Sequence, residues 1–305
     1  MTITFFETLG PVIDKSVEFA AKQLGLSTAQ IYERIVAETD NNQAEWFSNR
    51  VPNLNYRNQD CRLAYLYIVA TANANTFKQV LTVNDEIRNY ILQTATRERA
   101  LKICAFGAGP GTELLGLAKF LCEQNLGFSV SVDFQLLDKV KEWANSWFGI
   151  RDELRNTFKR QCGLDHSQWP MIPAGNLLEC DVTDLGQLPH LGNVWDQDLY
   201  VVNFLLSEIF DDDPGLRAFL SEVASVAPTG AKFVFIERRG SMWCDRMNNI
   251  ASDAGLDLSS FIELRSDKLD RNEKPENLGA IYAGIGGRKS PRKSYNVVYS
   301  IGTKR

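Results

Sequence analysis

A glycine-rich turn is the part of the sequence best suited to hold a ligand. The apolar run at 101–106 breaks, before helical spacing resumes at 114–121, into Gly107-Ala108-Gly109-Pro110-Gly111. Glycine tolerates positive φ and lets a ligand approach the backbone closely. A helix that begins there points unpaired N–H groups into the turn. The turn therefore predicts a site for a nucleotide-like ligand.

Two carboxylates follow later apolar runs in the same way. Asp138 ends the segment FQLLD, and Asp181, followed by Val182, ends the segment LLECDV. A carboxylate after a strand commonly forms a turn or caps a helix, but it can also accept hydrogen bonds from both hydroxyls of a ribose. Because the turn and the two acids occur one per strand and in chain order, they favour a shared ligand site.

The spacing of the turn distinguishes between nucleotide ligands. The dinucleotide fingerprint G-x-G-x-x-G/A would place its last small residue at Thr112, so the match is incomplete. The chain instead has G-x-G-x-G followed by Thr112 and Glu113, which resembles the first motif of the class I S-adenosylmethionine-dependent methyltransferases. The resemblance covers about residues 100–305.

The resemblance implies S-adenosylmethionine as the cofactor and a role for each feature. The loop from Gly107 to Thr112 would face the neutral ribose and the zwitterionic methionine portion, not a pyrophosphate. Asp138 would bind the ribose hydroxyls. Asp181 would meet the adenine amino group, and the backbone N–H of Val182 would reach a ring nitrogen.

The fourth apolar run, 198–206, would border the transferred methyl group. Its sequence Asn203-Phe204-Leu205-Leu206 departs from the Asn-Pro-Pro-aromatic signature of nucleic-acid amino methyltransferases, which counts against methylation of adenine or cytosine amines. Asn203, Ser207 and Glu208 are the candidate catalytic residues, and Asn203 is also a candidate cofactor ligand. Glu208 would act as a base or orient an amine; the alternative is that it caps or solvates the turn.

Alternating strands and helices must position these residues. The pattern predicts a doubly wound, mostly parallel seven-stranded sheet. Its last two strands have no helix between them, which implies an antiparallel C-terminal hairpin. The expected strands are 101–106, 130–138, 176–180, 198–206, 231–237, 261–265 and 295–302, with helices over 140–158, from 213, and over 242–254. A loop is expected at 169–173, and a charged, glycine-rich insertion at 266–294.

The first 99 residues read as an all-helical cap or substrate subdomain before a methyltransferase domain of residues 100–305. Ser27 and Gln30 form a capping box that begins the second helix. A polar break is expected at 39–43, a loop at 51–60, and helices over 61–81 and 86–96. The alternative is a helical bundle that only stabilises the fold.

Several polar residues have both a structural and a functional interpretation. Tyr56, Arg57, Arg62 and Tyr65 could roof an acceptor pocket or belong to the core and the surface. Three consecutive acids at 211–213 could bind a cation, but a position before a helix N-terminus favours simple charge complementarity, and we predict no metal site.

Other charged residues are expected at the surface. His166 and His190 lie in loop-like sequence without partner ligands. The single basic cluster contains Arg288, Lys289, Arg292 and Lys293. It could be a solvated loop or a loop that contacts phosphate.

Composition restricts the function classes. The 305 residues are 44% hydrophobic and carry a net charge of −5, so nothing global suggests nucleic-acid binding. No apolar stretch approaches the roughly 18 residues that a membrane span needs. The N-terminus lacks the basic region of a signal peptide, and six cysteines without C-x-x-C pairs suggest a reducing compartment. We therefore expect a cytoplasmic protein without a membrane partner.

Together these features predict an S-adenosylmethionine-dependent methyltransferase. We favour a small molecule or a protein side chain as the acceptor, with RNA as the alternative. A non-catalytic module that binds S-adenosylmethionine remains a second alternative, and Thr112 disfavours a nicotinamide oxidoreductase. Because methyl transfer is an in-line displacement, much of the catalysis can come from holding donor and acceptor in line.

Overall fold

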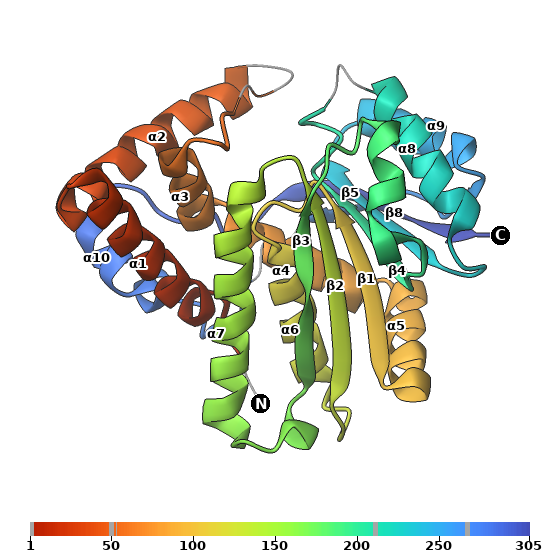
Figure 1. Ribbon diagram of the computed structural model, residues 1–305, viewed down its shortest axis with the longest axis horizontal. Coiled ribbons are helices and arrows are strands. Elements are labelled where there is room, and N and C mark those ends of the chain that lie inside the picture. Colours follow the sequence, from red (N-terminus) through yellow and green to blue (C-terminus); the bar gives the residue numbers. More distant parts are fainter. Residues whose placement is uncertain (1–2, 49–51, 53, 210–212, 266–268) are drawn as a thin grey trace.

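A single sheet lies at the centre of the protein, with helices on both faces (Figure 1). The computed structural model describes residues 3–48, 52, 54–209, 213–265 and 269–305. The sheet has eight strands in the order β3-β2-β1-β4-β5-β8-β6, and β7 also pairs with β8. The strands are β1 Ala100–Phe106, β2 Val130–Asp138, β3 Met171–Glu179, β4 Leu199–Asn203, β5 Lys232–Arg238, β6 Leu256–Leu258, β7 Ile262–Arg265 and β8 Asn296–Lys304.

The first five strands are parallel, and the C-terminal part is antiparallel, as predicted. The strand expected over 261–265 is β7, and a further short strand that was not expected, β6, also pairs antiparallel with β8. Leu258 pairs with Gly302 and Ile262 with Tyr299, so the segment between them has one extra residue, as in a β-bulge. The Ser259 N–H donates to the Ile301 carbonyl at 2.8 Å within this break.

Alternation along the strands divides the core into two layers, because successive side chains point to opposite faces. On β4, Leu199 and Val201 join one buried cluster, while Tyr200 and Val202 join the other. Both faces of the strand are buried, which explains its nearly continuous apolar sequence.

Four helices cover the first layer of the core, which contains Leu199 and Val201. Two helices cover the second layer, which contains Tyr200 and Val202. Helix α4 packs along α6, and α5 lies against β1, so part of the N-terminal helical region belongs to the sheet layer. The helices of the first layer are α4 Ala70–Val83, α5 Asp85–Glu98, α6 Thr112–Gln124 and α7 Ala144–Cys162. Those of the second are α8 Asp213–Val226 and α9 Ser241–Asp253.

The remaining helices form a group beside α7 (Figure 1). They are α1 Phe5–Leu24, α2 Thr28–Ser48, α3 Gln59–Ile68 and α10 Ala280–Ile285, with the 3-10 turn η6 Pro275–Leu278. Thus the insertion after β7 forms two short helical elements and packs on α1 and α2. The division into residues 1–99 and 100–305 stays a prediction.

A buried ion pair fastens this group to the sheet layer. The Lys119 ammonium lies 2.5 Å from Glu273 Oε1 and 2.7 Å from Asp270 Oδ2, and the side chains of Lys119 and Glu273 are 2% and 0% exposed. Glu273 also accepts hydrogen bonds from the N–H groups of Phe5 at 2.8 Å and Phe6 at 3.3 Å. One carboxylate therefore connects the first turn of α1 with α6.

Some predicted boundaries are wrong. The expected break at 39–43 is helical and belongs to α2. Thr39 and Asn42 are buried while Asp40 and Asn41 face solvent, so these polar residues are divided between the two faces of one helix. The expected helix over 61–81 is two helices, α3 and α4, which meet at Val69. Strand β3 begins at Met171, inside the expected loop, and β4 ends at Asn203 because Phe204 adopts φ +56°. The Ser27–Gln30 capping box is confirmed.

Candidate functional site

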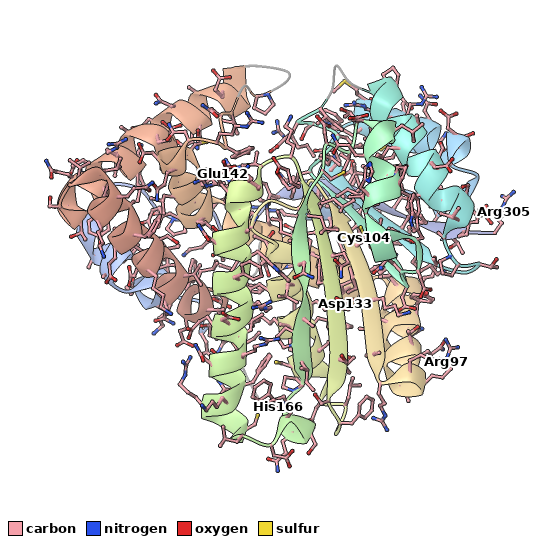
Figure 2. The ribbon with its side chains drawn as sticks, viewed as in Figure 1. Arg97, Cys104, Asp133, Glu142, His166 and Arg305 are labelled. Atoms are coloured by element: carbon pink, nitrogen blue, oxygen red, sulfur yellow. The ribbon has the colours of Figure 1, made fainter. Side chains whose placement is uncertain are left out.

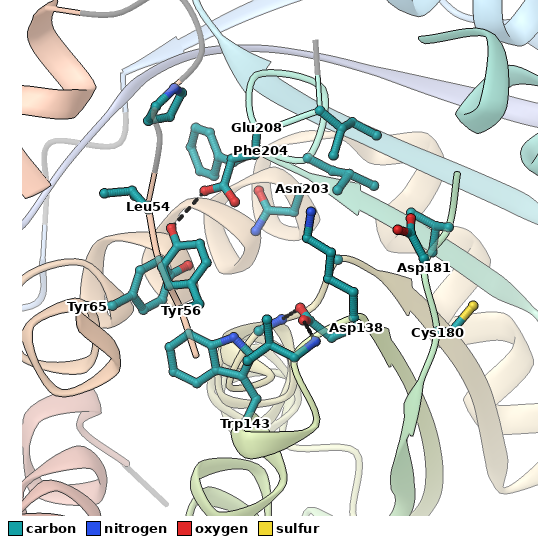
Figure 3. Close-up of a pocket in the computed structure, with 18 residues that line it drawn as sticks. Leu54, Tyr56, Tyr65, Asp138, Trp143, Cys180, Asp181, Asn203, Phe204 and Glu208 are labelled. Atoms are coloured by element: carbon teal, nitrogen blue, oxygen red, sulfur yellow. Dashed lines mark hydrogen bonds between the residues drawn. The ribbon is translucent and has the colours of Figure 1, made fainter. Parts of the chain in front are cut away.

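A cavity of about 440 Å³ opens at the carboxyl ends of the parallel strands (Figure 3). Its wall includes the ends of β1, β2, β3 and β4 and a segment before α3. This is the edge at which open α/β sheets bind ligands. The residues that line it are Pro52, Leu54, Tyr56, Tyr65, Gly107, Gly109, Asp138, Lys139, Val140, Trp143, Cys180, Asp181, Val182, Asn203, Phe204, Leu205, Glu208 and Ile209.

The glycine loop forms one wall of the cavity. Gly107 and Gly109 line it with φ of +58° and +51°. A Cβ on Gly107 would overlap the side chain of Leu205, so only glycine allows this approach. Of the other predicted loop residues, Ala108, Gly111 and Thr112 do not line the cavity; all three are buried behind it.

Asp138 orders the loop as well as lining the cavity. Its Oδ2 accepts the Gly109 N–H at 2.8 Å, and its Oδ1 accepts the Val140 N–H at 2.8 Å (Figure 3). Burial raises the pKa of this carboxyl to about 6, although the two N–H donors oppose the shift. The carboxylate therefore connects the end of β2 with the turn after β1 and retains lone pairs for a ligand.

Asp181 lies across the cavity from Trp143 (Figure 3), and Val182 also lines the cavity. Asp181 Oδ1 accepts hydrogen bonds from the Thr183 N–H at 3.0 Å and the Thr183 hydroxyl at 2.7 Å. Its backbone N–H donates to Gln187 Oε1 at 2.9 Å. Asp181 is thus a turn-forming residue that also lines the cavity.

Glu113, which sequence reasoning did not assign to the site, covers the N-terminus of α6. Its buried carboxylate interacts with its own backbone N–H and with Thr112, and it accepts the Asn203 amide N–H at 2.6 Å. Burial raises the pKa of Glu113. Glu113 Oε2 and Asn203 Oδ1 are buried without a hydrogen-bond partner. Of the two residues only Asn203 lines the cavity, and its unpaired acceptor calls for a ligand with an N–H donor.

Glu208 lies at the opposite end of the cavity from Asp138 (Figure 3). The Tyr56 hydroxyl donates to Glu208 Oε1 at 3.0 Å. Burial raises the pKa of the Glu208 carboxyl to about 7, while the Tyr56 hydrogen bond opposes this shift. A carboxylate that titrates near neutral pH can exchange a proton with a reacting group.

Three aromatic rings form the wall opposite Asp181 (Figure 3). Tyr56 and Tyr65 meet edge to face at 5.6 Å between ring centroids, and they lie 5.6 Å and 5.4 Å from the ring of Trp143. The Arg62 guanidinium donates to the Tyr56 carbonyl at 2.7 Å, which holds this segment in place. Of the four residues considered as a roof, only Tyr56 and Tyr65 line the cavity.

Ser207 lies outside the cavity lining. Its hydroxyl donates to the Phe204 carbonyl at 3.1 Å, and its N–H donates to Glu237 Oε2 at 2.9 Å. Glu237, at the end of β5, is fully buried and burial raises its pKa. These contacts hold the turn after β4, where Phe204 keeps φ +56°, a conformation that non-glycine residues rarely adopt.

The predicted surface residues lie away from the cavity. His166 and His190 are exposed, and His166 lies near the start of β3, at the opposite end of the sheet (Figure 2). Arg288 forms a bidentate pair with Glu33 at 2.6 and 2.9 Å, and Lys289 pairs with Asp40. Much of the basic cluster is therefore neutralised by α2.

Two further observations concern metals and membranes. No group of three or more potential metal ligands occurs among residues that the structure describes; positions 211 and 212 of the acidic run lie outside them. None of the described helices combines the length and hydropathy of a membrane span.

Several residues that line the cavity are not among the site residues expected from the sequence. Only their position relative to a strand end, and not their chemistry, indicates that they belong to the site. Trp143 falls within the helix expected over 140–158, and its position five residues after Asp138 places it near the carboxyl end of β2. Lys139 and Val140 had the same signal. Phe204 and Leu205 line the cavity only because β4 ends earlier than its apolar sequence suggested.

Comparisons with known proteins find similar solved structures at low sequence identity. No protein-family model matches the chain, and no curated protein matches its sequence. A structure described as a class I S-adenosylmethionine-dependent methyltransferase from Listeria monocytogenes is similar at 10% identity and TM-score 0.44, covering 98% of this chain and 87% of that chain. A SAM-dependent methyltransferase from Methanosarcina mazei is similar at 13% identity and TM-score 0.42, covering 73% and 98%. Because these identities and TM-scores are low, the function has to be inferred from the residues of the site.

Proposed function

We propose that the chain is an S-adenosylmethionine-dependent methyltransferase. The observation that carries this proposal is the charge of the glycine-loop cavity: among the lining residues that the structure describes, Asp138, Asp181 and Glu208 are acidic and only Lys139 is basic. The helix N-terminus that would attract a pyrophosphate is already occupied by the Glu113 carboxylate. A ligand with a positively charged sulfonium suits such a site, whereas a dinucleotide pyrophosphate does not.

The residues present fit this cofactor. The cavity volume of about 440 Å³ lies in the range of small-molecule sites. Asn203 lines the cavity, and its Oδ1, which has no partner, would accept an N–H group of the methionine ammonium. Asp138 would bind the ribose hydroxyls, and Asp181 with Val182 would border the adenine.

Glu208 would act on the methyl acceptor. When bound, S-adenosylmethionine supplies a sulfonium methyl group, whose bond to sulfur breaks, with its electron pair left on sulfur, as the bond to the acceptor forms. The Glu208 carboxylate would accept the proton that an amine or hydroxyl acceptor loses, since its pKa of about 7 matches neutral pH. Tyr56 would hold this carboxylate in position through its 3.0 Å hydrogen bond.

Isothermal titration calorimetry tests the cofactor assignment. S-adenosylmethionine and its demethylated product should both bind, and NAD should not. Saturable binding of NAD, or no heat with either sulfur compound, would overturn the proposal. A cavity variant, Gly109→Val, should lose binding, because its side chain would point toward the space near Trp143.

A small molecule or a protein side chain is the favoured acceptor class. Supporting this, the Arg288 and Lys289 side chains of the basic cluster are engaged by Glu33 and Asp40, so they offer little charge to phosphates. Binding to bulk RNA across salt concentrations tests this. Tight binding that falls steeply with salt, and is lost in the Arg288→Ala/Lys289→Ala/Arg292→Ala/Lys293→Ala variant, would favour RNA instead.

A further inference from the structure

A second cavity of about 290 Å³ adjoins the glycine-loop cavity. Tyr65, Phe204 and Glu208 line both cavities, so these three side chains form the boundary between them. The second cavity otherwise takes its walls from α4 and from residues near the ends of β5 and β8, not from the glycine loop. It is therefore a neighbouring space that shares Glu208 with the proposed cofactor site.

The two cavities carry opposite charge. Among the residues that the structure describes, carboxylates dominate the lining of the glycine-loop cavity, whereas the second cavity is lined by two guanidinium groups, Arg238 and Arg292, and one carboxylate, Glu208. Such a space attracts an anion, and a guanidinium fork matches the geometry of a carboxylate.

The two arginines are placed differently. The Arg292 guanidinium carbon lies 5.0 Å from the centroid of the Tyr295 ring, and Tyr295 in turn lies 4.9 Å from the Phe204 ring. Arg292 is thus positioned by the Tyr295 ring, which packs against the Phe204 ring. The Arg238 side chain has no ion pair or side-chain hydrogen bond to any other residue that the structure describes. A partly buried guanidinium without an ion pair to a described residue is suited to bind the anionic group of a ligand.

Asn73 supplies a second, independent indication of a ligand. It lines this cavity, is 5% exposed, and donates through Nδ2 to the Tyr65 hydroxyl at 2.6 Å. Its Oδ1 has no hydrogen-bond partner. Either orientation of the amide leaves one polar atom unpaired, and an unpaired buried polar atom is costly. A ligand with a hydrogen-bonding group beside its anion would satisfy it.

We propose that the second cavity binds the methyl acceptor and that this acceptor is a small carboxylate that also carries an amine or hydroxyl group. Arg238 and Arg292 hold the carboxylate, Asn73 bonds a polar group, and the amine or hydroxyl lies toward Glu208 at the boundary with the cofactor. This assignment rests on the proposed function, because it takes the glycine-loop cavity as the donor site.

Ligand binding observed by NMR tests the assignment with defined probes. Benzoate and 4-hydroxybenzoate are titrated against 4-hydroxybenzamide, a neutral match, with and without saturating S-adenosylhomocysteine. The carboxylates should bind about ten-fold more tightly than the amide, and Arg238→Met should remove this preference. Arg239→Met is the matched control, because its guanidinium pairs with Glu263 at 2.9 Å and lines neither cavity.

The outcomes separate this inference from the proposed function. Equal binding of the amide and the carboxylates, or a preference retained in Arg238→Met, would overturn the acceptor assignment. S-adenosylhomocysteine binding is measured by calorimetry on the same samples. If the unmodified protein does not bind this compound, the proposed function is overturned. The carboxylate titration without that compound still decides the acceptor assignment. Arg292→Met provides a second variant with the same expected loss.

Discussion

The Tyr56 hydroxyl and the Glu208 carboxylate, 152 positions apart in the chain, are joined by a hydrogen bond of 3.0 Å. Tyr56 comes from the segment before α3, and Glu208 from the turn after β4. The helical group and the sheet therefore meet at a titratable group in the cavity. The position of α3 relative to the sheet affects the acidity of Glu208 through this contact.

Replacing Tyr56 with phenylalanine should raise the pKa of Glu208 further above about 7, since burial already raises it and the lost hydrogen bond opposed the shift. A hydrogen bond to a charged group contributes about 1.5–3 kcal/mol, which corresponds to about 1–2 pK units. Infrared difference titration against Glu208→Gln measures the change. Tyr65→Phe, which keeps the hydrogen bond, should change the pKa less, and a lowered pKa in Tyr56→Phe would contradict the argument.

Glu208 should make the unliganded protein less stable as the pH rises. Its folded pKa, raised mainly by burial, is about 7 against a reference of 4.5. Between these values the folded state binds more protons than the unfolded state, so the free energy of unfolding falls with pH. The loss is up to roughly 3 kcal/mol for this shift. Urea denaturation at pH 5 and pH 8 should show a smaller difference in Glu208→Gln; an equal difference would remove Glu208 from this account.

Asp138→Asn should weaken the binding of S-adenosylmethionine. The amide that replaces Oδ1 or Oδ2 cannot accept both backbone N–H groups, so Gly109 or Val140 loses its partner. The expected loss in calorimetry is about 1.5–3 kcal/mol. Asp133→Asn on the same strand, whose carboxylate accepts the Gln135 amide at 3.0 Å, is the control and should bind normally.

Gly107→Ala should destabilise the protein more than Gly127→Ala. Both glycines have positive φ, +58° and +74°, but a Cβ on Gly107 would overlap Leu205 whereas one on Gly127 has nothing within 4 Å. The control should lose about 1 kcal/mol from backbone strain alone, and Gly107→Ala about 1–3 kcal/mol more from overpacking. Urea denaturation compares them. Equal losses would mean that Leu205 moves aside freely.

Lys119→Met should lower the free energy of unfolding by about 3–5 kcal/mol, because it leaves the buried Glu273 carboxylate without its cation. Lys289→Met removes a surface pair with Asp40 and should cost about 0–1 kcal/mol. Chemical denaturation of the two variants in parallel makes the comparison. Similar small losses in both would mean that the N–H donors of Phe5 and Phe6 suffice for Glu273.

The strands and the glycine loop could be predicted from the sequence because local patterns determine them. The apolar run before Gly107 and the acids Asp138 and Asp181 mark where three strands end, and parallel strands bring those ends to one edge. The expected fold class, a mostly parallel sheet with an antiparallel C-terminal part, is confirmed on this basis.

The acceptor side could not be predicted because it depends on contacts between distant segments. Nothing in the sequence near Tyr56 indicates Glu208, and nothing near Asn73 indicates Arg238 or Arg292. The insertion before β8 looked like a charged loop, since its helix-forming residues are few and its ionic partners lie on α2 and α6. Long-range packing, not local propensity, determines its structure.

The hydrogen bonds between Glu273 and the first turn of α1 affect when this part of the protein can fold during translation. Phe5 and Phe6 leave the exit tunnel before Glu273, because the carboxylate that accepts their N–H groups lies 268 and 267 residues later. At about 5–20 residues per second, the gap is roughly tens of seconds. During that time the apolar face of α1 has no η6 or α10 to cover it, so this part of the core can form only after the segment that contains Glu273 has been synthesised.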